Sequence, residues 1–233
     1  MGIVIPKLVK MGEFGVKSGM VKKDLAKTIY SEIFPARLSK SDRRRLEIID
    51  GAIRAFAGVD YDSVSFDEIG ESVGASRRLV QHYFPNKEEL FLLAMKSIRA
   101  QFQVLAVGRF SKAKSPVDQL KEYVRSTFDW IEKEPVHVRA WFVYFVVCTK
   151  NKKLRSAHAE LTKMGEDRIA GLISAAHADS QISKGELSYM AKTIQRLITG
   201  GILEAASERE LPELGKVREQ VVRTCLAVAG LSA

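Results

Sequence analysis

Cationic and hydrogen-bonding side chains gather between Ser76 and Lys87, in the stretch SRRLVQHYFPNK. In the major groove of a duplex, arginine pairs bidentately with guanine and glutamine with adenine, while lysine and helix N-termini suit phosphate. Val80 and Phe84 are apolar and lie four residues apart, so we expect both to point into a small core. The outward positions are then Arg77, Arg78, Leu79, Gln81, His82 and Tyr83.

Two short helices joined by a turn are expected to hold these side chains in place. Ser65 and Glu68 form the Ser-x-x-Glu capping box that satisfies free N–H groups at a helix start. Gly74 tolerates the positive φ at which helices often end, and Ser76 can cap the next helix. Such a pair forms a helix-turn-helix, and the amphipathic helix predicted over 41–57 would complete a three-helix domain.

The charge balance of this segment does not by itself favour an anionic partner. The whole chain has 37 Lys and Arg against 28 Asp and Glu, a formal net charge of +9. Residues 39–90 nevertheless carry eight basic and ten acidic side chains. The case for nucleic acid therefore rests on position, because three arginines that begin the first helix can form one basic stripe with Arg77 and Arg78.

The candidate DNA contacts combine this stripe with the caps and outward positions of the two short helices. Each has a plainer interpretation: Arg77 and Arg78 can be a solvated face, and Tyr83 fits a core position as well as a phosphate contact. Lys87 can also be merely solvated, although it begins a helix whose free N–H groups suit phosphate. The predicted DNA-binding residues are Arg43, Arg44, Arg45, Ser65, Ser76, Arg77, Arg78, Leu79, Gln81, His82, Tyr83 and Lys87.

The stretch ASRRLVQHYFPNKEEL is similar to the segment VSxGTLYxYFxSKEEL of the TetR family of transcriptional regulators. The resemblance extends upstream and covers residues 43–90. It implies a three-helix DNA-binding domain, a helical ligand-binding and dimerisation domain behind it, and a dimer that binds a near-palindromic operator. Arg78, Leu79 and Gln81 depart from the residues frequent in the family, so no operator sequence is implied.

The rest of the chain also predicts helices. Apolar residues recur at helical spacing, glycines and prolines separate the segments, and no alternating strand pattern appears. We therefore expect an all-α protein with an N-terminal three-helix helix-turn-helix DNA-binding domain and, by the resemblance, a C-terminal helical ligand-binding and dimerisation domain. The expected helices span 41–57, 65–73, 76–83, 86–108, 116–133, 136–149, 151–178, 184–209 and 213–230.

Three parts of the chain are expected. Residues 1–38 are an N-terminal extension with an amphipathic helix near 20–34, residues 39–86 the DNA-binding domain, and residues 87–233 the ligand-binding and dimerisation domain. The extension can be a basic arm on DNA, a helix covering the body, or an artefact of the chosen start codon. A basic arm predicts that its deletion flattens the salt dependence of DNA binding.

The C-terminal part mixes aromatic and polar residues, as small-molecule cavities do. Core packing explains any single one of these residues better, so the resemblance carries the expectation of a ligand pocket. The predicted pocket residues are Phe102, Phe128, His137, Trp141, Phe145, Arg168 and Gln195.

The stretch LITGGILEAA, which ends at Ala206, places two glycines inside a predicted helix. Each costs about 1 kcal/mol against alanine, and small residues let another helix approach closely. The stretch resembles the family's dimerisation helix; intramolecular packing is the alternative. The predicted interface residues of the homodimer are Ile194, Leu197, Gly201, Ala205, Val221 and Leu226.

Other classes of function find little support in the sequence. Cys148 and Cys225 lack metal or redox spacing, and no zinc motif, nucleophile elbow or phosphate loop appears. We expect no enzyme, no cofactor and no metal. The longest apolar run, Ala140 to Cys148, is too short to cross a membrane and no signal peptide is recognisable, so we expect a cytoplasmic protein without membrane contact.

The predicted function is a dimeric DNA-binding transcriptional regulator, a repressor released by an unidentified small-molecule effector. The alternative is a helical protein-interaction module that kept the fold but lost sequence-specific DNA binding. The acidic balance of residues 39–90 motivates this alternative. Salt-dependent DNA affinity separates the two, because phosphate contacts release counterions.

Overall fold

The chain is almost entirely helical in the part that the computed structural model describes, which is residues 39–110, 112–178, 182–207 and 211–232. No strand occurs among these residues, so the predicted all-α fold is confirmed. The elements are α2 (Lys40–Gly58), the 3-10 helix η1 (Tyr61–Ser63), α3 (Phe66–Ser72), α4 (Arg77–Tyr83), α5 (Lys87–Phe110), α6 (Pro116–Lys133), α7 (Pro135–Lys150), α8 (Lys152–Ala176), α9 (Lys184–Ser207) and α10 (Leu211–Val228). Each helix predicted beyond residue 40 is present within a few residues, whereas η1 was not predicted and the helix expected near 20–34 lies outside the described residues.

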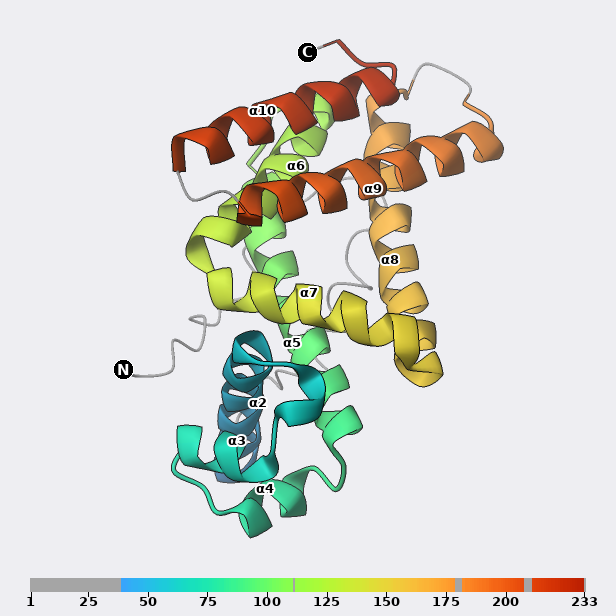
Figure 1. The fold of residues 1–233 in the computed structure, drawn as a ribbon. Helices are drawn as coiled ribbons and strands as arrows, with labels where there is room; N and C mark the ends of the chain where they lie inside the picture. Colours follow the sequence, from blue (N-terminus) through green and yellow to red (C-terminus); the bar gives the residue numbers. More distant parts are fainter. Residues whose placement is uncertain (1–38, 111, 179–181, 208–210, 233) are drawn as a thin grey trace.

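The elements α2, η1, α3 and α4 form a small domain, called the head below, at the lower end of Figure 1. Capping boxes at Ser39 and Ser65 start α2 and α3, because each serine accepts from a backbone N–H three residues on. Ile53, Ile69 and Val80 come from three different helices and are each at most 1% exposed. Their burial holds the three helices together.

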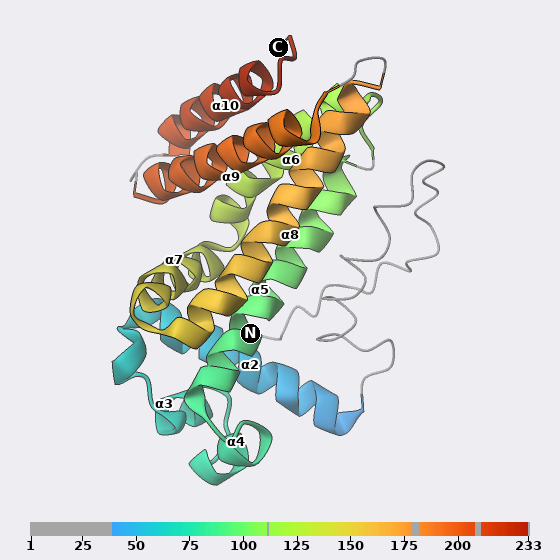
Figure 2. The same cartoon turned by 90° about the vertical axis from the view of Figure 1, so that its right-hand side faces the viewer.

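Helices α5 to α10 form a second unit, called the body, and α5 runs from the head into it. α7 crosses the lower end of the body in Figure 1 and packs on α2, so it forms part of the contact between body and head. α9 and α10 lie side by side at the opposite end (Figures 1 and 2), where α10 also packs on α6.

The head and the body share one apolar core. Phe56 of α2 meets Phe91 of α5 edge to face, with ring centroids 4.5 Å apart, and Phe91 meets Tyr144 of α7 in the same way at 5.7 Å. All three side chains are fully buried. The first turns of α5 contribute to the core of the head, because Phe91 packs on Phe56. The domain boundary predicted between residues 86 and 87 stays a prediction.

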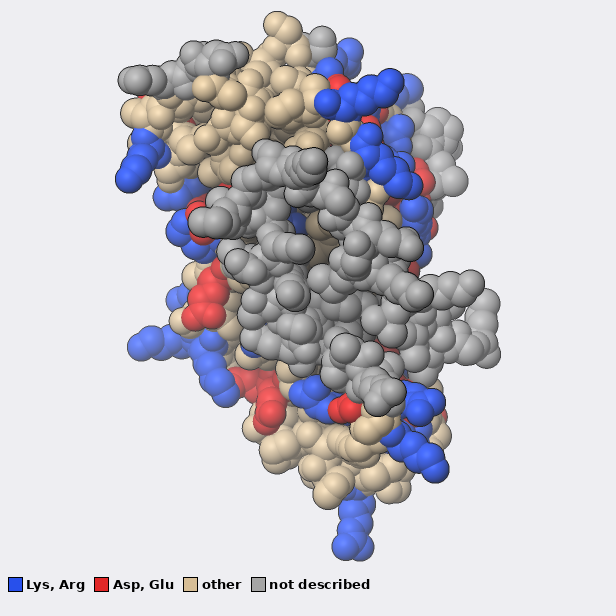
Figure 3. All heavy atoms as spheres, turned by 180° about the vertical axis from the view of Figure 1, so that it is seen from behind, with Lys and Arg blue, Asp and Glu red and all other residues tan. Residues whose placement is uncertain are grey.

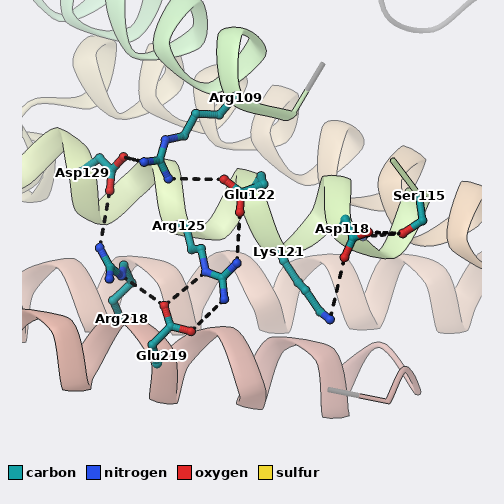
Figure 4. Close-up of polar contacts among 9 residues, drawn as sticks. All are labelled: Arg109, Ser115, Asp118, Lys121, Glu122, Arg125, Asp129, Arg218 and Glu219. Atoms are coloured by element: carbon teal, nitrogen blue, oxygen red, sulfur yellow. Dashed lines mark hydrogen bonds and ion pairs between the residues drawn. The ribbon is translucent and has the colours of Figure 1, made fainter. Parts of the chain in front are cut away.

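Ion pairs tie α6 to α10 and to α5 (Figure 4). The carboxylate of Asp129, which is 5% exposed, lies 2.6 Å from Arg109 of α5 and 3.7 Å from Arg218 of α10. Arg125 of α6 binds both carboxylate oxygens of Glu219 at 3.2 and 2.9 Å. These bonds lower the pKa of Glu219, and the bidentate geometry fixes the register of α10 on α6.

One described helix is long and apolar enough to cross a membrane by those two criteria, the segment Lys87–Arg109 of α5. More than half of its apolar window, 56%, is buried inside the protein. We therefore interpret α5 as a core helix.

Candidate nucleic-acid interface and ligand cavity

Helix α4 exposes polar side chains that the fold does not use. Ser76 accepts a hydrogen bond from the Leu79 N–H at 3.2 Å and so caps the helix, as predicted. Arg78, Gln81 and His82 are exposed and make no hydrogen bond or ion pair with the described residues. Basic side chains project from this end of the molecule in Figure 3.

Two glycines set the angle between α3 and α4. Gly74 has φ +61°, the left-handed conformation expected for the turn. Gly70 was not anticipated: a Cβ added to it would lie 2.4 Å from the carbonyl oxygen of Ala75. This close approach lets α3 pack directly on the turn and fixes the direction in which α4 leaves it.

The three arginines at the start of α2 have different surroundings. Arg44 donates to the carbonyl oxygens of Val73 at 3.0 Å and Gly74 at 2.8 Å, and to Glu47 at 2.6 Å. Arg45 lies over the ring of Phe84, 5.5 Å from its centroid. Arg43 is exposed and has no polar partner among the described residues. Arg44 thus ties α2 to the turn before α4, and only Arg43 of the three is unengaged.

Lys87 is also engaged inside the protein. Its ammonium donates to the carbonyl oxygens of Tyr61, Asp62 and Val64 at 2.9, 3.0 and 3.1 Å. It also lies 4.7 Å from the centre of the Tyr61 ring. A lysine has three N–H donors and all three are used. Lys87 therefore fastens the η1 loop to α5, and a phosphate contact would require it to leave these carbonyls.

The remaining predicted DNA contacts are neither fully free, as Arg78 is, nor fully engaged, as Lys87 is. Arg77 pairs with Asp67 at 2.9 Å, and both side chains are more than half exposed, so the pair contributes little and is easily exchanged. The hydroxyl of Tyr83 lies 3.2 Å from that of Ser41. Ser65 serves its capping box, and Leu79 is half-buried beside the exposed residues of α4.

A cavity of about 400 Å³ lies in the body between α5, α6, α7, α8 and α9. Of the predicted pocket residues, four line it: Phe102, Trp141, Phe145 and Gln195. The other three do not. Phe128 is fully buried in the core under α9, and the buried ring of His137 lies 3.8 Å from Glu134 on the side of α7 toward α2. Arg168 does not line the cavity, but its charge lowers the pKa of Arg99.

Arg99 of α5 is one of the cavity residues that sequence reasoning missed, and it is the buried cation among them. Its Nε is buried without a hydrogen-bond partner, and the pKa of its guanidinium is lowered, first by burial and then by the positive charge of Arg168. The sequence signal was an arginine placed between Ile98 and Ala100 inside a strongly apolar helix. His158 of α8, also on the wall, has a pKa lowered by burial and by Arg99.

The described residues offer neither a metal site nor a reactive thiol. No group of three or more His, Cys, Asp or Glu side chains that could hold a metal occurs among them. Burial raises the pKa of Cys225 to about 12 and also raises that of Cys148. Both thiols are therefore protonated near neutral pH.

Five of the six residues predicted for a dimer interface are buried within one chain. A Cβ added to Gly201 would lie 2.7 Å from Val221 of α10 and 3.1 Å from the Phe128 ring, so this glycine lets α9 approach α10 and α6. Leu197 is half-buried. The outer surface of α9 instead exposes Tyr189 and Leu203. The buried positions are Ile194, Gly201, Ala205, Val221 and Leu226.

Comparison with known families matches the head and the start of α5. Residues 48–94 match the family described as bacterial regulatory proteins, tetR family. The chain is 26% identical over 112 residues to the transcriptional regulator BetI of Rhizobium meliloti, covering 48% of this chain and 55% of that protein. It is 41% identical over 64 residues to the transcriptional repressor AcnR of Corynebacterium diphtheriae, covering 27% and 34%. The chain thus spans about half or less of the curated relatives it matches.

Solved structures extend the likeness to the body. A TetR-family regulator of Cytophaga hutchinsonii superposes with a TM-score of 0.67 at 16% identity, over 84% of this chain and 98% of the other. A protein of Saccharomonospora viridis, solved in complex with choline, gives 0.67 at 17% identity over 77% and 93%. At these identities the likeness concerns the fold.

Proposed function

We propose that this chain, whose head matches the tetR family of bacterial regulatory proteins, is a member of that family and a dimeric transcriptional repressor released from DNA by a small molecule. One observation carries the proposal: α4 exposes Arg78, Gln81 and His82 without a hydrogen bond or ion pair among the described residues, whereas the nearby Arg44 and Lys87 donate to backbone carbonyls. Side chains of these types, unpaired on a helix of a helix-turn-helix, suit base edges in the major groove.

DNA binding by the head divides its contacts into two kinds. Arg78 and Gln81 of α4 read base edges, with the half-buried Leu79 next to them against a thymine methyl. Arg43, Arg77 and the N-terminal end of α4 contact phosphates and set the register, since such contacts position a protein without specifying sequence. Two heads of a dimer would enter successive major grooves of a near-palindromic operator. The cytoplasm, where the DNA lies, is the expected location.

Ligand release needs a link between the cavity and the head, and two helices supply one. α5 lines the cavity with Arg99 and Phe102 and reaches the core of the head with Phe91. α7 lines it with Trp141 and packs on α2. A ligand that binds the two arrangements of α5 and α7 with different affinity shifts the angle between the heads.

The test selects bound fragments from the source genome with purified protein. Enrichment of a short inverted repeat is the expected result, and its affinity falls as salt rises. Arg77→Ala with Arg78→Ala abolishes specific binding. Lys112→Ala with Lys114→Ala removes the same charge from the exposed α5–α6 loop and serves as the matched control.

Two results would contradict the proposal. No enrichment at low salt would favour the interaction module that has lost DNA binding. Unchanged operator affinity in the Arg77 and Arg78 double variant would show that α4 does not read the operator. Sedimentation of the protein with and without operator DNA measures whether the bound species is a dimer.

A further inference from the structure

The cavity lining combines aromatic and polar side chains. The aromatic ones come from α5, α6 and α7, among them Phe102, Trp130 and Trp141. Charged and amide groups come from α5, α8 and α9, with Arg99, Glu166 and Gln195. A ligand that fills such a space has an apolar body and one polar end.

Arg99 lacks a counter-ion among the described lining residues. No ion pair of Arg99 occurs among the described residues, and its Nε is buried without an acceptor. Arg168, whose Nη1 is likewise buried and unpartnered, adds a second positive charge nearby. A desolvated cation without an anion is unfavourable, and this one faces a cavity rather than packed core.

The charges around the cavity have a positive excess. Lys192 and Arg196 of α9 line it together with Arg99, whereas Glu166 is the one acidic residue among the described lining. Burial and Arg99 lower the pKa of His158, so its ring is neutral near neutral pH. The aromatic side chains alone would also suit a quaternary ammonium ion, but such a ligand would meet Arg99.

Gly165 makes room for the polar groups. A Cβ added to it would lie 2.6 Å from Gln195 Oε1 and 2.9 Å from Arg99 Nη2. Both side chains therefore converge over one glycine of α8, at a spot where an amide and a guanidinium can bind the same group. A carboxylate accepts hydrogen bonds from both.

We propose that the cavity binds an amphipathic organic anion, with an aromatic or aliphatic body against Trp130 and Trp141 and its carboxylate or equivalent acid on Arg99. This inference deepens the proposed function by naming the chemical class of the effector, and rests on it only for the effect on DNA. The fold neighbour from Saccharomonospora viridis was solved with choline, a cation; Arg99 gives this cavity the opposite preference.

Both tryptophans of the chain line the cavity, so their fluorescence reports its occupancy directly. The experiment titrates the full chain with 4-phenylbutanoate, its neutral amide, the corresponding primary amine, and choline. We expect the carboxylate to bind most tightly, the amide more weakly, and the two cations weakest. Tighter binding of either cation, or no response to the carboxylate at millimolar concentration, would overturn the proposal.

Arg99→Met tests the named group. We expect it to weaken carboxylate binding on the order of 10- to 100-fold while leaving the amide within about twofold. It should also raise the melting temperature of the free protein, because it removes a desolvated charge at similar volume. Arg223→Met, on the exposed surface of α10, is the matched control, and Arg99→Gln replaces Arg99→Met if that variant does not fold. A carboxylate preference that survives these changes at Arg99 would refute the assignment.

The same samples separate this inference from the proposed function. Carboxylate binding without release of operator DNA would leave the ligand class standing and remove the effector role. Absence of operator binding would contradict the regulator, while the fluorescence titration would still decide the ligand class.

Discussion

The cations of the head and those of the cavity differ in what surrounds them. Arg44 of the head and Lys87, which begins α5 beside it, donate to backbone carbonyls of the α3–α4 turn and the η1 loop. Arg99 and Arg168 in the body each keep a buried nitrogen without a partner. A satisfied cation stabilises the fold and has no donor left for a ligand, whereas an unsatisfied one is available for binding. The same residue types thus serve as framework in one region and as a binding site in the other.

The same contrast holds within the head, where Arg44 is engaged and Arg78 is not, and it gives a prediction for Arg78. Arg78→Ala should weaken operator binding on the order of 10- to 100-fold per head, since one good base contact contributes about 1–3 kcal/mol. The melting temperature should stay the same, because the side chain of Arg78 is exposed and makes no hydrogen bond or ion pair with the described residues. Fluorescence anisotropy with a labelled operator, together with thermal unfolding, measures both quantities.

Arg77→Ala is the neighbouring control. Its guanidinium already pairs with Asp67, so part of its charge is neutralised before DNA arrives, and we expect a smaller loss with little sequence preference. If Arg77→Ala weakens operator binding more than Arg78→Ala and also relaxes sequence specificity, the distinction between free and engaged cations does not hold on α4.

Lys87 should show the opposite behaviour. Lys87→Met removes three hydrogen bonds to carbonyl oxygens, one of them on buried Val64, and should destabilise the head by about 2 kcal/mol. Operator affinity of the folded variant should change far less than that of Arg78→Ala. Urea unfolding gives the free energy. Unchanged stability with a large loss of DNA affinity would place Lys87 among the DNA contacts after all.

Local signals explain why the helices were predictable and these roles were not. Helix ends have local signals at fixed positions in the sequence. Such signals are the capping serines Ser65 and Ser76, Gly74 in the turn, and the prolines that begin α6 and α7. The carbonyl oxygens that accept from Arg44 and Lys87 lie more than twenty residues away along the chain, and any residue type supplies one. Likewise, whether Arg99 finds a hydrogen-bond acceptor depends on the residues that the fold places around it, and none accepts from its Nε.

For a related reason, the sequence could not distinguish a dimer interface on α9 from packing within one chain. Small and apolar residues on α9 predict close helix packing, but the pattern does not say whether the neighbouring helix belongs to the same chain. In the structure Gly201 faces Val221 and Phe128 of its own chain, while Gly200, one residue earlier, is exposed with nothing within 4 Å of an added Cβ. These adjacent glycines form a natural pair for testing the two kinds of packing.

Gly201→Ala should destabilise the body by about 1–3 kcal/mol, because the new methyl group overpacks the contact of α9 with α10 and α6. Gly200→Ala should stabilise the free chain by up to about 1 kcal/mol through helix propensity. Thermal unfolding measures both. If Gly200→Ala instead weakens self-association in sedimentation, the exposed side of α9 is the dimer surface. Equal stability of the two variants would contradict the intramolecular assignment of Gly201.

The smallest effect concerns the neutral histidine of the cavity. Burial and Arg99 lower the pKa of His158 below its ordinary value of 6.5, so the unfolded chain binds a proton more readily than the folded one. The contribution of the neutral ring to stability is therefore complete above pH 6.5 and is lost as the pH falls toward the lower folded pKa. His158→Gln should reduce the pH dependence of the melting temperature between pH 7 and about pH 5, while His137, whose pKa burial also lowers, keeps its share. This window lies above the lowered pKa values of Glu88, Glu186 and Glu219. An anion on Arg99 should also reduce this dependence, because it cancels the charge that disfavours His158 protonation. A profile that a bound carboxylate leaves unchanged would place the anion away from Arg99.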